Sequence, residues 1–221
     1  IELKSKNQEK QKLKELMMNP LDLLSNSSYV SRFNDAFENE EMVYFDTETT
    51  GLNVLEDDIV QIAAFKVKNG KIVDNSSFNV FIETEKSIPE KLGDLTNPLV
   101  EAYNNNPHLS KKEALQQFIE YAGNCRLLGH NVTFDHLILQ NNISRYLNKE
   151  FKADTIDSLY LAKLVFPRLS SYKLKDLLST LHIEGENSHL ADDDIAATYN
   201  LVKLCHEQSR HIADMHKQLT T

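Results

Sequence analysis

The chain has 221 residues, of which 41% are hydrophobic, and its formal net charge is −9. This length and apolar content suit one domain with a sizeable core, and no apolar run approaches the roughly 20 residues that span a bilayer. The negative charge argues against broad, non-specific binding to a polyanion, but it leaves room for a small site where metal ions offset carboxylates and a few basic side chains bind phosphates.

Two features of the chain bear on its parent polypeptide and on its cellular compartment. It begins with Ile1 rather than Met, and we expect it to be a piece of a longer polypeptide. Its two cysteines, Cys125 and Cys205, stand in segments that also contain apolar residues, which favours buried thiols in a reducing compartment over a disulfide. We therefore expect a cytoplasmic location and no contact with a membrane.

The first 40 residues carry no recognisable chemistry. Residues 1–18 are rich in Lys, Glu and Gln and predict a polar helix at best, which Pro20 ends. Tyr29, Phe33 and Phe37 recur at helical spacing, so a short helix is expected to pack on the domain. We expect an N-terminal helical extension or linker over 1–40, a main domain over 41–207 and a C-terminal helical tail over 208–221.

An apolar run at 42–45 predicts a buried strand that ends in two carboxylates, Asp46 and Glu48, separated by one residue. Alternate side chains of a strand share a face, so both carboxylates point the same way. Two like charges this close are costly unless a cation lies between them, and Mg²⁺ and Mn²⁺ prefer such oxygen ligands. The competing interpretation is a solvated strand end, where acidic residues are common.

The segment after this turn predicts a hairpin. Residues 59–67 are apolar enough for a second strand, and Asn69 and Gly70 then form a strong hairpin sequence. Residues 71–83 alternate in polarity and predict a third strand. The sheet is therefore expected to open as an antiparallel three-strand meander.

The rest of the chain predicts helices and short strands in alternation. Ser110 and Glu113 form a capping box, and Gly123 ends the helix that they begin. The expected elements are helices at 97–103 and 110–121, a strand at 126–131, a helix at 133–146, a strand at 153–157, and helices at 158–166, at 171–181 and from 191 to beyond 205. This order predicts an α/β fold with a mixed central sheet, antiparallel at first and then parallel, flanked by helices.

Three further polar features stand where strands give way to helices, which is where sites gather in such sheets. Asp135 lies in a predicted first helical turn, where the helix dipole favours negative charge. His189 lies on a loop before the last helix, and helical phase leaves both Asp192 and Asp194 near the apolar stripe of that helix. Asp157 is best explained as a helix cap.

These segments together resemble a known family. Asp46 to Glu48, then residues 131–135 with the pattern N-x-x-F-D, then residues 189–194 with the pattern H-x-A-x-x-D, are similar in order and separation to the three motifs of the DEDDh exonucleases. Further segments of the sequence are also similar to the DnaQ-like proofreading exonuclease of bacterial DNA polymerase III, at 156–159, 166–167, 171–174 and 196–198. The resemblance covers about residues 42–205.

The resemblance implies a ribonuclease H-like fold, an exonuclease domain over 41–207 and the removal of nucleotides from the 3′ end of a nucleic acid. It selects Asp194 over Asp192, and it assigns the histidine subtype because His189 stands where a sister subtype has tyrosine. The implied metal ligands for two divalent ions, Mg²⁺ or Mn²⁺, are Asp46, Glu48, Asp135 and Asp194. His189 is expected to act as the general base.

The resemblance also implies residues that hold the terminal nucleotide, with Leu52 as a wedge against a base and Phe134 packed beneath the site. For each of these residues, a role in the core or in a turn is the competing interpretation. The expected substrate-binding residues are Thr47, Thr49, Leu52, His130, Asn131 and Phe134.

The expected partner is a single-stranded 3′ end, with DNA favoured over RNA. The rest of a larger polypeptide, or a polymerase or helicase, is a further expected partner. The alternatives are an RNA-directed exonuclease of the same family and a module that binds nucleic acid or docks a larger assembly without catalysis.

Overall fold

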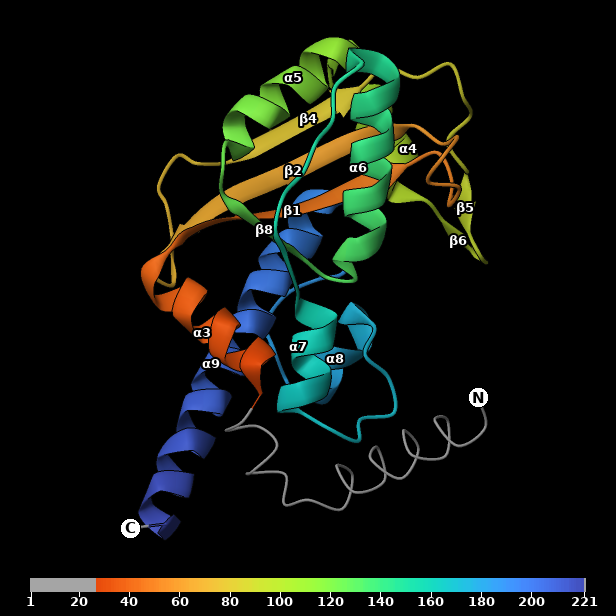
Figure 1. Ribbon diagram of the computed structural model, residues 1–221. Coiled ribbons are helices and arrows are strands. Elements are labelled where there is room, and N and C mark those ends of the chain that lie inside the picture. Colours follow the sequence, from red (N-terminus) through yellow and green to blue (C-terminus); the bar gives the residue numbers. More distant parts are fainter. Residues whose placement is uncertain (1–26, 221) are drawn as a thin grey trace, which may run out of the picture.

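The centre of the molecule is a seven-stranded mixed sheet, which the computed structural model describes together with its helices over residues 27–220 (Figure 1). The sheet has the order β7-β4-β2-β1-β8-β9, with β3 paired to β2, and a separate hairpin joins β5 and β6. The strands are β1 Glu41–Thr49, β2 Ile59–Lys68, β3 Lys71–Ile72, β4 Phe78–Ile82, β5 Lys91–Leu92, β6 Leu95–Thr96, β7 His108–Leu109, β8 Arg126–Gly129 and β9 Thr155–Asp157.

The helices of the described residues lie on both faces of this sheet (Figure 1). They are α3 Ser28–Asn39, α4 Pro98–Asn105, α5 Lys111–Ala122, α6 Val132–Leu147, α7 Ser158–Val165, α8 Leu174–Thr180 and α9 Ala191–Thr220. The helix expected over 1–18 lies outside the described residues. No helix within 27–220 combines the length and the apolar character that crossing a membrane requires.

The predicted meander and the parallel strands that follow it are confirmed. β1 pairs with β2 and β2 with β4 in antiparallel fashion, whereas β8 is parallel to both β1 and β9. Asn69 and Gly70 form the turn, both with positive φ, and a Cβ on Gly70 would lie 2.8 Å from the ring of Phe37. The chain therefore forms the predicted α/β fold with a mixed sheet.

The prediction of one continuous strand over 71–83 was wrong. This segment forms two strands, β3 and β4, which are separated by a turn. Asn75 adopts a positive φ of 56°, which breaks the ladder. The hydroxyl of Ser76 accepts from the backbone N–H of Lys66 at 3.0 Å and donates to the carbonyl of Val73 at 2.6 Å. A side chain thus takes the place of a strand partner at this point.

The two faces of β1 bury different cores, and this alternation positions the site. Met42 and Tyr44 lie in a core built with α3, α7, α8 and α9. Val43 and Phe45 lie in a second core, built with α5 and α6. Since side chains alternate along a strand, Asp46 and Glu48 continue the face that α9 covers.

Helix α3 shares this first core and also covers the edge of the sheet, as expected of a helix that packs on the domain. Val30, Phe33 and Phe37 are buried in the core. The hydroxyl of Tyr29 accepts from the backbone N–H of Asp157 at 2.7 Å, on the edge strand β9. Helix α9 continues from 191 through 220. The domain boundaries at 40/41 and 207/208 stay predictions.

Candidate active site

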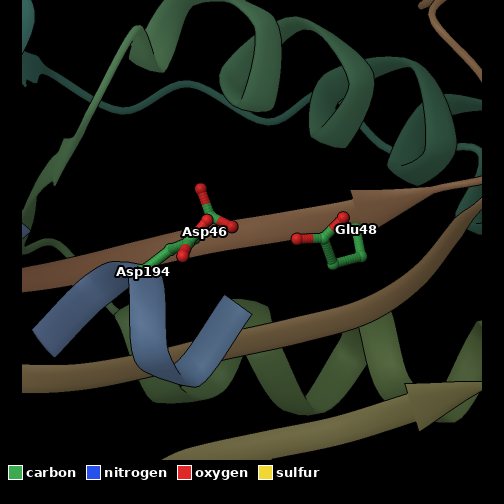
Figure 2. Close-up of side chains that lie close together, drawn as sticks. All are labelled: Asp46, Glu48 and Asp194. Atoms are coloured by element: carbon green, nitrogen blue, oxygen red, sulfur yellow. The ribbon is translucent and has the colours of Figure 1, made fainter. Parts of the chain in front are cut away.

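Three carboxylates converge at the end of β1. One oxygen of each of Asp46, Glu48 and Asp194 can be chosen so that all three lie within 4.8 Å of one another. Figure 2 shows Asp46 and Glu48 along β1 and Asp194 on the helix that faces them. The fold therefore brings together acids that are far apart in the sequence.

Local structure explains which acid of α9 joins this group. All three of its first-turn acids suit the positive end of the helix dipole. Asp194 is only 8% exposed and faces β1, whereas Asp192 is exposed and has its Oδ1 3.4 Å from the Nε2 of Gln61. Of the two residues that helical phase left open, Asp194 is the one in the carboxylate group.

Asp135 reaches the same strand by a different route. It lies in the first turn of α6, where its Oδ1 accepts from the backbone N–H of Thr47 at 3.1 Å and from the Thr47 hydroxyl at 2.6 Å. The pairing of β1 with β8 stops at Tyr44 and Leu128, so the edge of β1 beyond this point is free to accept a side chain. Asp135 is thereby fixed to the residue between Asp46 and Glu48.

The charges of neighbouring carboxylates act on Asp46 and Glu48, and burial acts on all four acids. Burial, followed by the charges of Asp135, Glu48 and Asp194, raises the pKa of Asp46 well above its ordinary value. Burial and the charges of Asp194 and Asp135 raise the pKa of Glu48 to about 8. Burial also raises the pKa of Asp135 to about 7, in spite of the hydrogen bonds from Thr47. Such a group favours a cation that offsets its charge.

The hydrogen bonds of Asp194 test whether the site fits a metal ion. Its Oδ2 accepts from the Nδ2 of Asn187 at 2.6 Å, but its Oδ1 is buried without a hydrogen-bond partner among the described residues. A buried carboxylate oxygen without a partner is costly, and a cation is its natural partner. The donor set is entirely oxygen, which suits Mg²⁺ or Mn²⁺. The residues present therefore fit a divalent ion.

His189 stands beside this group on the loop before α9. Its side chain is exposed and its backbone has a positive φ of 62°. Burial raises the pKa of Asp194, whereas the hydrogen bond from Asn187 and the charge of a protonated His189 oppose that rise. His189 therefore stands on the loop that leads directly into the helix carrying Asp194.

The turn after β1 carries three of the expected nucleotide-binding residues. Thr47 is buried and bonded to Asp135, as described above. The hydroxyl of Thr49 donates to the carbonyl of Gly51 at 2.7 Å and so braces the turn. Leu52 is 86% exposed. The structure thus leaves a large apolar side chain in solvent close to the strand end that bears the acids.

The other three expected binding residues lie at the start of α6. The ring nitrogens of His130 are both engaged, Nδ1 with the hydroxyl of Ser158 at 2.8 Å and Nε2 with the carbonyl of Tyr172 at 2.9 Å. Asn131 is exposed with a positive φ of 58°. Phe134 is half-buried against the second core. His130 therefore links the start of α6 to Ser158 and Tyr172 through both of its ring nitrogens.

Asp157 is the helix cap that the sequence predicted. Its Oδ1 accepts from the backbone N–H of Leu159 and also from that of Asn131, each at 2.9 Å. Two polar residues near the acids were not predicted. Asn187 has no sequence pattern that would reveal it, whereas Gln61 is conspicuous as a lone amide in the apolar strand β2.

Comparison with protein families and curated proteins gives matches along most of the chain. The family described as "Exonuclease", RNase T, matches residues 43–202. A PolC-type DNA polymerase III of Clostridium perfringens is 35% identical over 177 residues, which cover 80% of this chain and 12% of the relative. The PolC-type polymerase of Latilactobacillus sakei is 36% identical over 170 residues, which cover 76% of this chain and 11% of the relative. The chain thus spans about an eighth of these relatives.

Solved structures share the fold. Exonuclease I of E. coli in complex with a 5cy-dT13 oligonucleotide superposes with a TM-score of 0.62 at 17% identity, covering 82% of this chain and 45% of that one. Exonuclease X in complex with 5′ overhanging duplex DNA gives a TM-score of 0.55 at 24% identity, covering 78% of this chain and 99% of that one. The chain therefore belongs to the RNase T exonuclease family, as a DnaQ-like domain that resembles the exonuclease domain of PolC-type DNA polymerase III.

Proposed function

We propose that this domain releases nucleoside monophosphates from the 3′ end of DNA, as part of a larger replication or repair polypeptide. The observation that carries the proposal is the convergence of Asp46, Glu48 and Asp194 within 4.8 Å, with Asp135 fixed to the strand between the first two. The family match supports phosphodiester hydrolysis.

The four carboxylates would hold two divalent ions, Mg²⁺ or Mn²⁺. When bound, these ions lower the pKa of a water molecule and neutralise the charge that develops on the phosphate. Asp46 and Glu48 come from one rigid strand, and Asp194 comes from a helix packed against it, so the ligands are held by regular structure rather than by loops. Asn187 orients the carboxylate of Asp194 by donating to its Oδ2.

His189 would take the proton of the attacking water. Its side chain is exposed beside Asp194, and an imidazole accepts protons near neutral pH. The position of His189 on a loop allows the ring to approach the water while the acids stay fixed. This division of labour gives the proton transfer and the ligand binding to different residues.

The turn after β1 would grip the terminal nucleotide. The exposed side chain of Leu52 is suited to wedge against a base, and Thr47 and Thr49 offer backbone and hydroxyl groups along the same edge. Phe134 would pack beneath, and Asn131 would reach the phosphate from the exposed start of α6. His130 would act as a buttress, because its ring already bonds to Ser158 and Tyr172.

DNA is the proposed substrate because the curated relatives are named as DNA polymerases, and exonucleases I and X were solved with DNA. An RNA-directed enzyme of the same family is the second candidate, since the same acids would serve both substrates. A module that binds without hydrolysis is disfavoured, because the sequence keeps every acid of the three motifs.

The test uses 5′-labelled DNA and RNA oligonucleotides of matched sequence, single- and double-stranded, with Mg²⁺, Mn²⁺ or EDTA. We expect stepwise shortening of single-stranded DNA from the 3′ end, its loss in EDTA, and its loss in Asp194→Asn. Glu207→Gln alters an exposed acid on the same helix and should match the wild type. Faster shortening of RNA would favour the second candidate, and binding without shortening would overturn the enzyme assignment.

A further inference from the structure

Gln61 is a polar side chain buried in the middle of the sheet. It is 1% exposed and stands in β2, with its Cα directly opposite that of Glu48 on β1. The side chains of such opposed residues lie on the same face of a sheet. Gln61 therefore lies on the face that carries Asp46 and Glu48, below the start of α9.

The amide of Gln61 is fully used. Its Oε1 accepts from the backbone N–H of Ala191, the first residue of α9, at 3.2 Å. Its Nε2 donates to the Oδ1 of Asn79 at 3.0 Å and to the Oδ1 of Asp192 at 3.4 Å. The first N–H groups of a helix have no partner within the helix, and Ala191 is fully buried from water. Gln61 supplies the acceptor that this N–H requires.

We propose that Gln61 is a positioning residue for the exonuclease reaction, which ties the first turn of α9 to the sheet and so sets where Asp194 and His189 stand over Glu48. The inference rests on the proposed function. Ala191 stands two residues after His189 and three before Asp194. A shift of this helix start would therefore move both groups relative to the acids of β1.

The surrounding hydrogen bonds show why this tie matters. Among the described residues, the other hydrogen bonds at this helix start join residues 187–194 to one another, as in the pairs Asn187 with Asp194 and Ser188 with Asp193. These bonds shape the loop but do not attach it to the sheet. Gln61 is the side chain that links β2, the strand paired with β1 at Glu48, to α9, the helix that carries Asp194.

The test is Gln61→Met, which keeps the length of the side chain and removes its hydrogen bonds. We expect the affinity for Mn²⁺, measured by calorimetry without substrate, to fall about 10- to 100-fold, as when partners that orient metal ligands are lost. We expect kcat on single-stranded DNA to fall by a similar factor. KM should stay nearly unchanged, because the buried side chain of Gln61 is not available to contact the DNA.

Asn34→Leu is the matched control. Asn34 is also a buried amide, 7% exposed, and it donates to the hydroxyl of Ser209 at 3.0 Å, in the distant half of the same helix. This variant should lose thermal stability and keep both Mn²⁺ affinity and kcat. Should Gln61→Met fail to fold, Gln61→Asn keeps the amide but shortens its reach, and the same losses are expected from it.

Two failures are distinguishable. A wild-type protein that neither binds Mn²⁺ nor shortens DNA would overturn the proposed function itself. An active wild type together with a folded Gln61→Met or Gln61→Asn variant of unchanged Mn²⁺ affinity and kcat would overturn the role of Gln61 alone. The role of Gln61 would also be overturned if Asn34→Leu lost as much Mn²⁺ affinity and kcat per degree of lowered melting temperature as the Gln61 variants do.

Discussion

Asp46, Glu48 and Asp194 occupy positions where folding alone disfavours acidic residues. Burial raises the pKa of each, the charges of neighbouring acids raise those of Asp46 and Glu48 further, and one oxygen of Asp194 has no partner among the described residues. Groups perturbed in this way gather at functional sites, where a ligand supplies the missing interaction. At the scale of the residue, the site is therefore a set of carboxylates that a bound cation would stabilise.

The first prediction concerns the metal-free protein. Acids with raised pKa values bind more protons in the folded than in the unfolded state, from about pH 4 up to about 7 for Asp135 and about 8 for Glu48. Their effect on stability is least unfavourable at the acidic end of this window, and they destabilise the fold increasingly as pH rises through it. Calorimetry in EDTA should show this fall.

Two comparisons check the assignment. Mg²⁺ should raise the melting temperature more at pH 8 than at pH 5, because more of the carboxylates are then ionised. Glu48→Gln removes one of the groups and should weaken the pH dependence in EDTA. A variant with the same pH dependence as the wild type would contradict the assignment of the raised pKa to Glu48.

The second prediction separates proton transfer from metal binding. His189→Ala should lower kcat by about 10²- to 10⁴-fold, the usual contribution of a general base, while Mn²⁺ affinity measured by calorimetry stays close to that of the wild type. Asp46→Ala should lose both. Normal turnover by His189→Ala under saturating Mg²⁺ would remove His189 from the mechanism.

The third prediction concerns Asp58, which anchors the turn after β1. It is 1% exposed and accepts from the hydroxyls of Tyr146 at 2.7 Å and Thr84 at 2.8 Å, and from Lys111 at 2.9 Å. Burial raises the pKa of Asp58, but these hydrogen bonds outweigh burial and lower it. The stability that Asp58 contributes is therefore present above its ordinary pKa and is lost as pH falls through the lowered value.

Asp58→Asn leaves the surrounding donors poorly matched and should lower the free energy of unfolding by about 2 kcal/mol at neutral pH. Urea denaturation measures this loss. Asp74→Asn alters an exposed acid and should change the free energy by no more than about 0.5 kcal/mol. Equal stabilities of the two variants would show that Asp58 does not anchor the turn.

At the scale of the element, the sequence predicted the turns and helix caps that depend on neighbouring residues. The Asn69 and Gly70 turn, the capping box of Ser110 and Glu113, and the cap at Asp157 were all predicted and are confirmed. Each depends on residues close together in the sequence. The break between β3 and β4 was missed, because it depends on the hydroxyl of Ser76 bonding to Lys66 across the hairpin.

Long-range contacts set the limit of such prediction. β7 has two residues and pairs with β4, so it has no periodicity of its own. Motif resemblance indicated the acids of the site, but not the bond from Thr47 to Asp135 or the link from Gln61 to Ala191. These contacts join segments that only the folded sheet brings together.

The fourth prediction tests where the folding unit begins. α3 buries Phe33 fully in the core, which is worth about 2 kcal/mol or more, and its Tyr29 caps the edge strand β9. A chain that starts at Glu41 should be insoluble or melt well below the full chain. A chain that starts at Ser27 should keep most of the stability. Equal melting temperatures of the two fragments would show that α3 is dispensable.

At the scale of the whole molecule, the two faces of the sheet are packed differently, and the start of α6 adds Asp135 to the acids at the end of β1. The face covered by α5 and α6 is a continuous core. On the other face, the core of α9 and the smaller cluster of Val60, Phe81 and Leu99 under α4 leave the acids of β1 between them. With a net charge of −9, the molecule is expected under the proposed function to need bound cations to attract a phosphate backbone.

The most direct measurement is the anomalous scattering of Mn²⁺ in crystals of this chain soaked at saturating concentration. We predict two peaks in contact with the carboxylates of Asp46, Glu48, Asp135 and Asp194, and their loss in Asp194→Asn. Crystals of active protein in which Mn²⁺ binds elsewhere and leaves these four carboxylates without a peak would contradict the account.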